Sequence, residues 1–477
     1  MKTSCIDRAR AAARLLAATS ALAAAGGAWA EEPAGDWNGL LAGQLHILVH
    51  VTKDAAGHYA VTLESPDQGR FALPADQVAA DADHLDFTIA KIGGRFAGTW
   101  NAQKNGWAGT WTQGSVLPLV LSRTAAGASA PTPTRRPQEA AIDAGPRPYR
   151  QEPVHFANAA AGITLGGTLS LPEGAGPFPA VILIGGSGPG TRDEEILRHK
   201  IFLVLADALN RRGVAVLRYD KRGVGESTGD FATANLSAFA ADAQAALAFL
   251  KTRAEVAPDR IGLVGHSEGG AVAPMIAARD PSVRFVVLMA GPGMRIGQVL
   301  RLQNARIAKA SGVSDDEIAR KQAFFDKLGA DLAAARGDEQ VRAVARADVA
   351  QAVSDGIVLA ANADAFARQI TSPWAREAFG YDPIPALRRL RMPVLALNGS
   401  LDLQVPPDED LGPIRAALKD DPDATVVELP GLNHLFQTAT LGTPGEYGEI
   451  EETVAPLALK TIADWVVAHD AGPPGKG

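Results

Sequence analysis

Residues 261–278 read Ile-Gly-Leu-Val-Gly-His-Ser-Glu-Gly-Gly-Ala-Val-Ala-Pro-Met-Ile-Ala-Ala. The apolar run Ile261–Val264 predicts a short buried strand, and the small apolar residues after Gly269 predict a helix. Between them lies Gly265-His-Ser-Glu-Gly269, a Gly-x-Ser-x-Gly pattern at a strand-to-helix junction. In such a sharp turn the glycines relieve crowding around a strained serine. We therefore expect Ser267 to be a nucleophile exposed at the end of a strand.

A second segment, Gly225-Glu-Ser-Thr-Gly229, has the same pattern. It lies in a glycine-rich loop well beyond the nearest predicted strand, and no apolar helix follows it at once. The bare pattern is weak, but the context favours Ser267 over Ser227 as the nucleophile.

Strands and helices alternate on both sides of Ser267. This alternation predicts a mostly parallel sheet with helices on both faces, over about residues 151–470. A stretch with helical spacing, roughly 294–384, falls between two strands and is expected to be an inserted helical cap. The predicted strands are 181–184, 214–218, 261–264, 285–290, 394–398 and 426–429, and the predicted helices include 195–211, 236–252 and 457–468.

A serine nucleophile needs a histidine base, and the base needs a carboxylate that holds its tautomer. His434 directly follows the strand 426–429, and Asp402 follows the strand 394–398 in Gly399-Ser-Leu-Asp402. Of the nine histidines, His434 is the one in the expected position. We expect His266 to point away from the site and His199 to be exposed on a helix. Two weaker acid candidates in the loop of Asp402 are Glu409 and Asp410.

Acyl transfer also needs donors for the developing oxyanion. Gly185-Gly-Ser-Gly-Pro-Gly190 follows a strand, and its glycines would allow close backbone approach. We expect the backbone N–H groups of Ser187 and Glu268 to form this pair. Neither nucleotide-binding glycine pattern is present at the required position, so a phosphate cradle is disfavoured.

The first part of the chain has a different character. Residues 31–122 alternate apolar and polar residues between turn signals and predict a small all-β, barrel-like domain. Phe96-Ala-Gly-Thr-Trp100 recurs as Trp107-Ala-Gly-Thr-Trp111, which indicates two neighbouring strands. Their tryptophans fit a core better than a ligand groove. Residues 123–150, with five prolines and no apolar period, are expected to be a linker.

Residues 1–30 have the features of a secretory signal peptide: a basic start, an apolar stretch and the small-x-small site Ala28-Trp-Ala30. Removing the four basic residues and one acidic residue of this segment changes the formal net charge from −7 to −10. An acidic mature chain argues against nucleic-acid binding. The only cysteine, Cys5, lies in the leader, so neither a disulfide nor a thiolate metal site is expected. We expect no metal, no cofactor and no stable membrane anchor.

Together these segments resemble the serine-aminopeptidase-like (S33-type) α/β-hydrolases, especially the bacterial EstD-like carboxylesterases. The resemblance covers about residues 151–470, and the β domain is similar to a module attached to some secreted members. It implies an α/β-hydrolase fold, a small ester substrate, an acyl-enzyme and no cofactor, with triad roles for Ser267, Asp402 and His434. The matching segments are 185–193, 219–227, 265–269, 399–406 and Asn433-His434.

Two alternatives remain open. A peptidase or amidase would use the same triad and would need acidic residues that bind a substrate amino group. Asp315, Asp316 and Glu317 are candidates, although Ser314-Asp-Asp-Glu317 fits a helix capping box better. A binding protein, with the β domain as its functional part and a degenerate hydrolase domain, is the third hypothesis.

Overall fold

The computed structural model describes residues 32–41, 45–65, 69–113, 115–124, 134–358 and 363–470. The predicted leader, residues 1–30, lies outside these ranges. The chain divides into two compact units, one made mainly of residues before 130 and one mainly of residues from 131 on. Each unit is described by itself.

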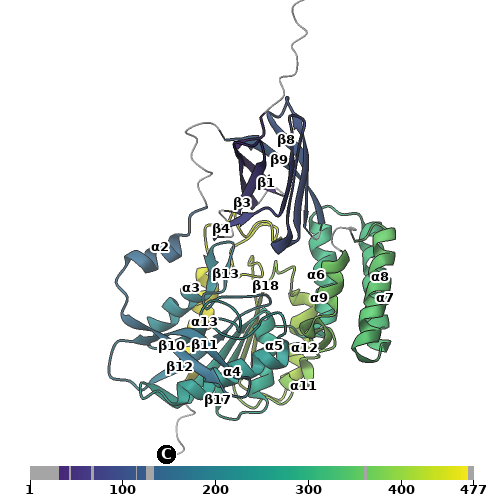
Figure 1. Ribbon diagram of the computed structural model, residues 1–477. Helices are drawn as coiled ribbons and strands as arrows, with labels where there is room; N and C mark the ends of the chain where they lie inside the picture. The colour runs from purple at the N-terminus through teal and green to yellow at the C-terminus, as the bar shows by residue number, and fades with distance from the viewer. Residues whose placement is uncertain are drawn as a thin grey trace, which may run out of the picture. The chain divides into compact units, whose positions relative to one another are not determined.

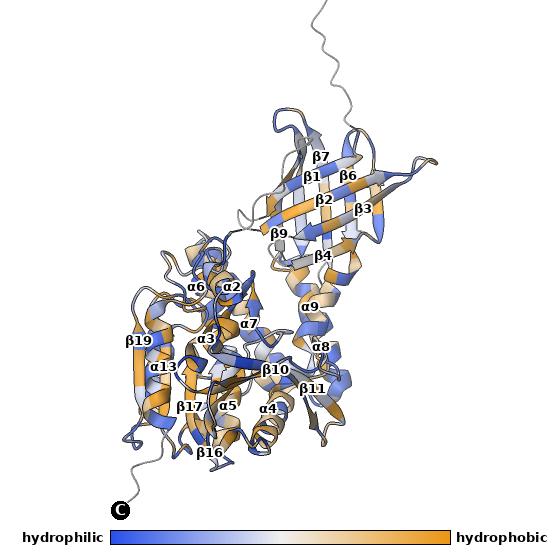
Figure 2. Cartoon of the chain, turned by 90° about the vertical axis from the view of Figure 1, so that its left-hand side faces the viewer, coloured by the Kyte–Doolittle hydropathy of each residue, from blue (hydrophilic) through white to orange (hydrophobic). Residues whose placement is uncertain are grey.

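The N-terminal unit is a sheet of nine described strands, in which strands consecutive in the chain are also neighbours in the sheet, except the fourth and fifth, which lie at its two ends (Figures 1 and 2). The first and last strands also pair, with Trp37 opposite Arg123. The strands are β1 (Gly35–Leu41), β2 (Leu45–Lys53), β3 (Tyr59–Ser65), β4 (Gly69–Pro74), β5 (Gln77–Ala80), β6 (His84–Ile89), β7 (Gly94–Asn101), β8 (Gly106–Gln113) and β9 (Ser115–Arg123).

Alternate side chains of this sheet form an aromatic core. The two copies of the repeated segment lie on β7 and β8, where Phe96 pairs with Trp111 and Trp100 with Trp107. Trp107 and Trp111 are buried, and Trp107 forms edge-to-face pairs with Trp37 and Trp100. Because buried rings are not available to a ligand, these two tryptophans are core residues and do not line a groove.

The second unit is built on a sheet of eight described strands in the order β10-β11-β15-β12-β16-β17-β18-β19 (Figure 1). Pairing is parallel from β15 to β19, and β11 runs antiparallel to β10 and β15. The strands are β10 (Tyr149–Asn158), β11 (Ile163–Pro172), β12 (Phe178–Ile184), β15 (Ala215–Tyr219), β16 (Val256–His266), β17 (Val283–Met289), β18 (Val394–Gly399) and β19 (Thr425–Leu429).

Helices cover both faces of this sheet, which confirms the predicted fold class. Successive residues of β12 point to opposite faces, so Ile182 joins one apolar core and Val181 the other. On the face of Ile182 pack α4 (Leu236–Lys251) and α5 (Glu268–Ala277). On the other face pack α3 (Ile201–Asn210) and α13 (Pro456–Asp470). Burial on two faces explains why a strand such as β17 is apolar at every position except Arg284 (Figure 2).

A helical cap lies between β17 and β18. Its α7 begins after Ser314, whose Oγ accepts a hydrogen bond from the N–H of Glu317 at 3.3 Å. Phe324 and Leu328 of α7 pack against Val349 of α8 in a separate small core. The cap helices are α6 (Ile296–Ala310), α7 (Asp315–Ala334), α8 (Gly337–Ser354), α9 (Ala363–Ile370) and α10 (Pro373–Ala378), followed by the short α11 (Ile384–Leu387). None of the helices within the described ranges combines the length and apolar character that crossing a membrane requires.

Three expectations were wrong. The segment 123–150 is not a linker throughout, because α2 (Pro137–Ala144) lies within it and buries Ile142. Its Arg136 donates hydrogen bonds to the carbonyls of Leu197, Gly448 and Ile450. Residues 136–144 are therefore packed as part of the second unit.

The predicted helix 195–211 begins only at Ile201. Before it, β13 (Glu195–Ile196) and β14 (His199–Lys200) form a tight hairpin, whose Leu197 and Arg198 have left-handed backbone angles. His199, expected to be exposed, is fully buried and bonded to Thr453 and the Tyr447 carbonyl. Burial lowers the pKa of His199 to about 4, so its ring is neutral near pH 7.

Candidate active site

Ser267 occupies a strained turn between β16 and α5. Its φ of 53° lies in the left-handed region, which a residue other than glycine adopts only at a cost. The flanking positions have no room for a side chain, because a Cβ on Gly265 would lie 2.1 Å from the Gly269 carbonyl oxygen. A Cβ on Gly269 would lie 2.0 Å from the carbonyl oxygen of Ile184. Packing at this turn thus explains both glycines of the pattern.

The structure brings Asp402 and His434 together. Asp402 Oδ2 lies 2.8 Å from His434 Nδ1, and both side chains are buried. The other carboxylate oxygen, Oδ1, accepts hydrogen bonds from the backbone N–H groups of Gln404 and Val405 at 2.8 and 2.9 Å. The carboxylate is therefore fixed in place and favours the tautomer with a proton on Nδ1. That tautomer leaves Nε2 of His434 free to accept a proton.

The loop that carries His434 is tied to the serine turn. His266, the neighbour of Ser267, has its Nε2 3.0 Å from the carbonyl oxygen of His434. The two imidazole rings lie 5.0 Å apart between centroids. Ser267, Asp402 and His434 follow β16, β18 and β19, which run parallel, so all three stand at the same edge of the sheet.

His266 belongs to a buried ion pair that the sequence did not reveal. Its Nδ1 lies 3.0 Å from Glu194 Oε1, and that oxygen also accepts the N–H of Gly186 at 2.5 Å. Burial by itself lowers the pKa of His266, but the Glu194 carboxylate outweighs burial and the pKa is raised. Glu194 and His266 therefore connect the glycine-rich loop, at the N–H of Gly186, to the loop that carries His434, at its carbonyl oxygen.

The glycine-rich loop after β12 lies against Ser267. A Cβ on Gly186 would lie 3.3 Å from Ser267 Cβ. Because the N–H of Gly186 is bound to Glu194, the next N–H in the loop, that of Ser187, is the candidate oxyanion donor. Glu268 is the first residue of α5, a position whose N–H has no acceptor within the helix. Both predicted donors thus belong to segments that flank Ser267.

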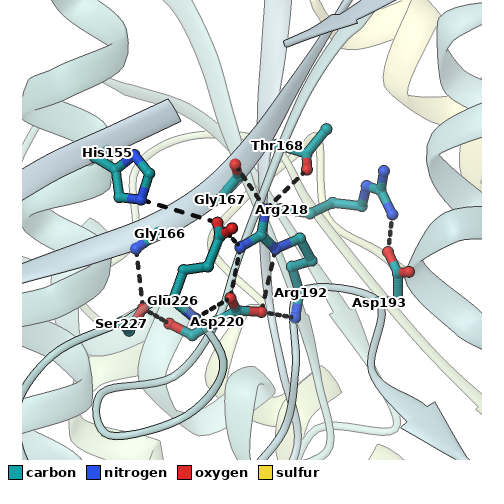
Figure 3. Close-up of polar contacts among 10 residues, drawn as sticks. All are labelled: His155, Gly166, Gly167, Thr168, Arg192, Asp193, Arg218, Asp220, Glu226 and Ser227. Carbon is teal, nitrogen blue, oxygen red and sulfur yellow. Dashed lines mark hydrogen bonds and ion pairs between the residues drawn. The ribbon is translucent and has the colours of Figure 1, made fainter. Parts of the chain in front are cut away.

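The second Gly-x-Ser-x-Gly segment has a different environment (Figure 3). Ser227 Oγ donates to the carbonyl oxygen of Asp220 at 2.7 Å and accepts the N–H of Gly166 at 3.0 Å. Gly225 is needed because a Cβ there would lie 2.4 Å from Asp220 Oδ2. Ser227 is therefore a structural residue whose hydroxyl is already hydrogen-bonded on both sides.

Asp220 is the centre of this second site. Arg192 binds it through Nε–Oδ1 at 3.2 Å and Nη2–Oδ2 at 2.6 Å, and also reaches Glu226 at 2.6 Å (Figure 3). Burial would raise the pKa of Asp220, but the hydrogen bonds from Arg192 outweigh it and the pKa is lowered. Arg192 follows the glycine-rich loop, so this ion pair fixes the far end of that loop.

The other acid candidates do not contact His434 in the described structure. Glu409 pairs at the surface with Arg306. Asp410 is fully buried on α12 (Pro407–Ala417) and accepts the N–H of Gly293 at 2.6 Å. Burial, with the charge of Asp402 nearby, raises the pKa of Asp410 to about 7.

Two of the three acidic residues in the first turn of α7 are paired with lysines of the cap. Asp315 pairs with Lys309 and Glu317 with Lys321, all at the surface. Among the described residues there is no cluster of three or more His, Cys, Asp or Glu side chains placed to hold a metal ion.

Comparison with known proteins adds a family to this geometry. The model of the family "Serine aminopeptidase, S33" matches residues 199–437, half of the chain. Esterase EstD of Thermotoga maritima is 30% identical over 307 residues, which are 64% of this chain and 65% of EstD. Thiohydrolase apmlB of Arthrinium phaeospermum is 39% identical over 93 residues, 19% of this chain and 29% of apmlB. The chain thus spans less than two thirds of the length of these relatives.

Among solved structures, the Pyrococcus furiosus esterase Pf2001 is 16% identical, with a TM-score of 0.43. The alignment covers 68% of this chain and 92% of Pf2001. Because the family model spans half of the sequence, the chain belongs to the serine aminopeptidase S33 family of α/β-hydrolases.

Proposed function

We propose that this protein is a serine hydrolase that cleaves carboxylic esters through an acyl-enzyme at Ser267. The observation that carries the proposal is the buried Asp402–His434 pair, whose loop is hydrogen-bonded to the residue beside the strained Ser267. A fixed imidazole next to a serine at a strand-to-helix turn is the arrangement that activates a hydroxyl.

The reaction would run in two halves. Ser267 Oγ attacks the ester carbonyl carbon while His434 Nε2 takes its proton, and the N–H groups of Ser187 and Glu268 stabilise the oxyanion. His434 then protonates the departing alkoxide, which leaves as the alcohol. Water then attacks the acyl-serine while His434 takes a proton from the water, and His434 returns this proton to Ser267 Oγ as the carboxylic acid is released. Asp402 orients and stabilises the imidazolium in both halves.

An ester is favoured over an amide as the substrate. EstD is named an esterase. The candidate acids Asp315 and Glu317 are paired with lysines. The name of the family keeps an aminopeptidase or amidase as the second candidate.

One panel distinguishes the two candidates. Purified protein would be assayed on p-nitrophenyl esters of graded acyl length beside aminoacyl p-nitroanilides, each with wild type and Ser267→Ala. We expect ester turnover that depends on Ser267 and little anilide turnover. Faster cleavage of anilides would replace the esterase proposal with the peptidase. Full ester turnover by Ser267→Ala would end both.

We also propose that the protein is secreted, to the periplasm or the medium, because residues 1–30 have the features of a signal peptide. N-terminal sequencing of the protein from expressing cells would test this. A mature chain that starts at Glu31 supports secretion, and an intact leader on active protein contradicts it.

A further inference from the structure

Lys221 is a buried cation between the two segments that flank Ser267. Its side chain is only 8% exposed. Nζ donates a hydrogen bond to the carbonyl oxygen of Gly186 in the glycine-rich loop. It also forms an ion pair with Glu268 Oε1 at 2.9 Å, on the residue that follows Ser267. One ammonium group therefore joins the loop after β12 to the start of α5.

The contact with Gly186 acts on a particular peptide group. The carbonyl of Gly186 and the N–H of Ser187 belong to the same planar peptide, in which they point in opposite directions. Fixing the carbonyl therefore fixes the direction of the Ser187 N–H, the proposed oxyanion donor. A hydrogen bond from a cation also polarises the peptide and strengthens its N–H as a donor.

The contact with Glu268 acts on the second donor. The backbone N–H of Glu268 is the other proposed oxyanion donor, and its carboxylate is held from two sides. Lys221 binds Oε1, and Trp374 Nε1 of the cap helix α10 donates to Oε2. The first residue of α5 is thereby fixed relative to the glycine-rich loop.

Burial distinguishes this lysine from those at the surface. Nζ lies 4.5 Å from the centre of the Phe239 ring, so the charge is surrounded by aromatic and paired groups. Taking an ammonium group out of water is unfavourable unless its hydrogen bonds are satisfied, and a buried ion pair often adds little to stability. An interaction that orients the site accounts for the position of Lys221 better than a contribution to stability does.

We propose that Lys221 is a positioning residue of the oxyanion hole, which orients and polarises the Gly186–Ser187 peptide and holds Glu268 beside it. This inference rests on the proposed function, because it needs an oxyanion to form at Ser267. The effect should be seen in the transition state and not in substrate binding, since the oxyanion is present only there.

The test uses Lys221→Met, which removes the donor, and Lys221→Gln, which keeps a neutral donor. We expect Lys221→Met to lower kcat by about 10- to 100-fold, with KM changed by less than about threefold, because the donors are misaligned and not deleted. Lys221→Gln should fall between Lys221→Met and wild type. Inhibition by an alkyl trifluoromethyl ketone, which forms a tetrahedral oxyanion with the serine, should weaken in the same order.

Two controls separate orientation from stability. Lys251→Met removes a part-buried lysine, the last residue of α4, which pairs with Asp280. The kcat of this variant should equal that of wild type. Trp374→Phe removes the other hydrogen bond to Glu268 but keeps both contacts of Lys221. A loss of kcat that is larger in Lys221→Met than in Trp374→Phe supports the route through the Gly186–Ser187 peptide.

Several outcomes would overturn the proposal. Unchanged kcat in folded Lys221→Met would do so, as would a loss confined to KM. If neither Lys221 variant folds, the lysine is a structural residue and the proposal falls. Failure of the proposed function is distinguished by the wild type itself, which would then show no Ser267-dependent ester turnover.

Discussion

The chain contains the pattern Gly-x-Ser-x-Gly twice, and the two copies differ in backbone conformation, in the role of their glycines and in the hydrogen bonds around the serine. At Gly265–Gly269 the serine has a φ of 53°, and the glycines allow a helix to start directly against a strand. At Gly225–Gly229 the glycine makes room for the Asp220 carboxylate, and the Ser227 hydroxyl is hydrogen-bonded on both sides. The comparison teaches that the backbone conformation and the hydrogen bonds at each serine, and not the pattern, distinguish the two copies.

The largest expected effect separates the two serines directly. Ser267→Ala should lower kcat for an ester substrate by about 10⁶-fold, because the variant lacks the hydroxyl that we propose as the nucleophile. Ser227→Ala should keep kcat within about threefold of wild type and lose some stability, since the Gly166 N–H loses its acceptor. Steady-state kinetics and urea unfolding would measure both variants. A larger loss of kcat in Ser227→Ala than in Ser267→Ala would contradict the assignment of the two serines.

A second pair of tests concerns the aspartate near each serine, Asp402 for Ser267 and Asp220 for Ser227. Asp402→Asn should lower kcat by about 10⁴-fold, because the amide can no longer hold the Nδ1–H tautomer of His434. The variant should still fold, since Asn Oδ1 can accept the same backbone N–H groups.

The matched control is Glu409→Gln, an exposed acid in the first turn of the following helix α12, whose kcat should not change. A normal rate in Asp402→Asn would show that another carboxylate orients the histidine.

The corresponding change in the second site should affect stability instead. Asp220→Asn leaves Arg192 without its buried carboxylate and should lower the free energy of unfolding by about 3–5 kcal/mol. Urea denaturation followed by tryptophan fluorescence would measure it. Asp464→Asn, which breaks a surface pair with Arg212 and Lys460, is the control and should cost no more than about 1 kcal/mol. Equal losses in the two variants would show that the buried Arg192–Asp220 pair contributes no more to the free energy of unfolding than a surface ion pair does.

The smallest effect concerns the buried Asp410, which lies near Asp402 but outside both serine sites. Its pKa is about 7 in the folded protein and near 3.8 in the unfolded chain. Since the folded state binds this proton more tightly, the contribution to stability is fully present below pH 3.8. It is lost progressively as the pH rises towards 7 and beyond. Between pH 5 and pH 8 the loss amounts to about 2–3 kcal/mol.

Asp410→Asn keeps the acceptor for Gly293 but cannot ionise. Because only wild type loses this contribution, the stability of the variant relative to wild type should rise by about 2–3 kcal/mol between pH 5 and pH 8, as measured by urea unfolding at both values. A constant difference between the two proteins across this range would show that Asp410 does not titrate there.

The comparison of the two serines also shows which parts of the molecule could be predicted from sequence. The turn at Ser267 is local, since strand, glycine, serine and helix follow one another within about ten residues. The mostly parallel sheet follows from alternating strand and helix patterns, and the structure confirms that fold class. Asp402 and His434 were proposed from their positions after strands, and the structure places them 2.8 Å apart.

Contacts between distant segments could not be read in the same way. His199 is buried by residues near 447 and 453, which lie about 250 positions further along the chain. No local sequence pattern predicts that burial. The pair of Glu194 with His266 joins two loops 72 residues apart. Lys221 and Arg192 stand in glycine-rich segments where a charged residue would ordinarily be solvated, and only the packed structure shows that they are buried or paired.

The central claim is that Ser267, and not Ser227, is the activated hydroxyl, and covalent labelling tests it most directly. Wild type, Ser267→Ala and Ser227→Ala would be treated with an alkyl fluorophosphonate, digested and mapped by mass spectrometry. We expect one adduct per chain on the peptide that contains Ser267, in wild type and Ser227→Ala and absent from Ser267→Ala. An adduct on Ser227, or undiminished labelling of Ser267→Ala, would contradict the claim.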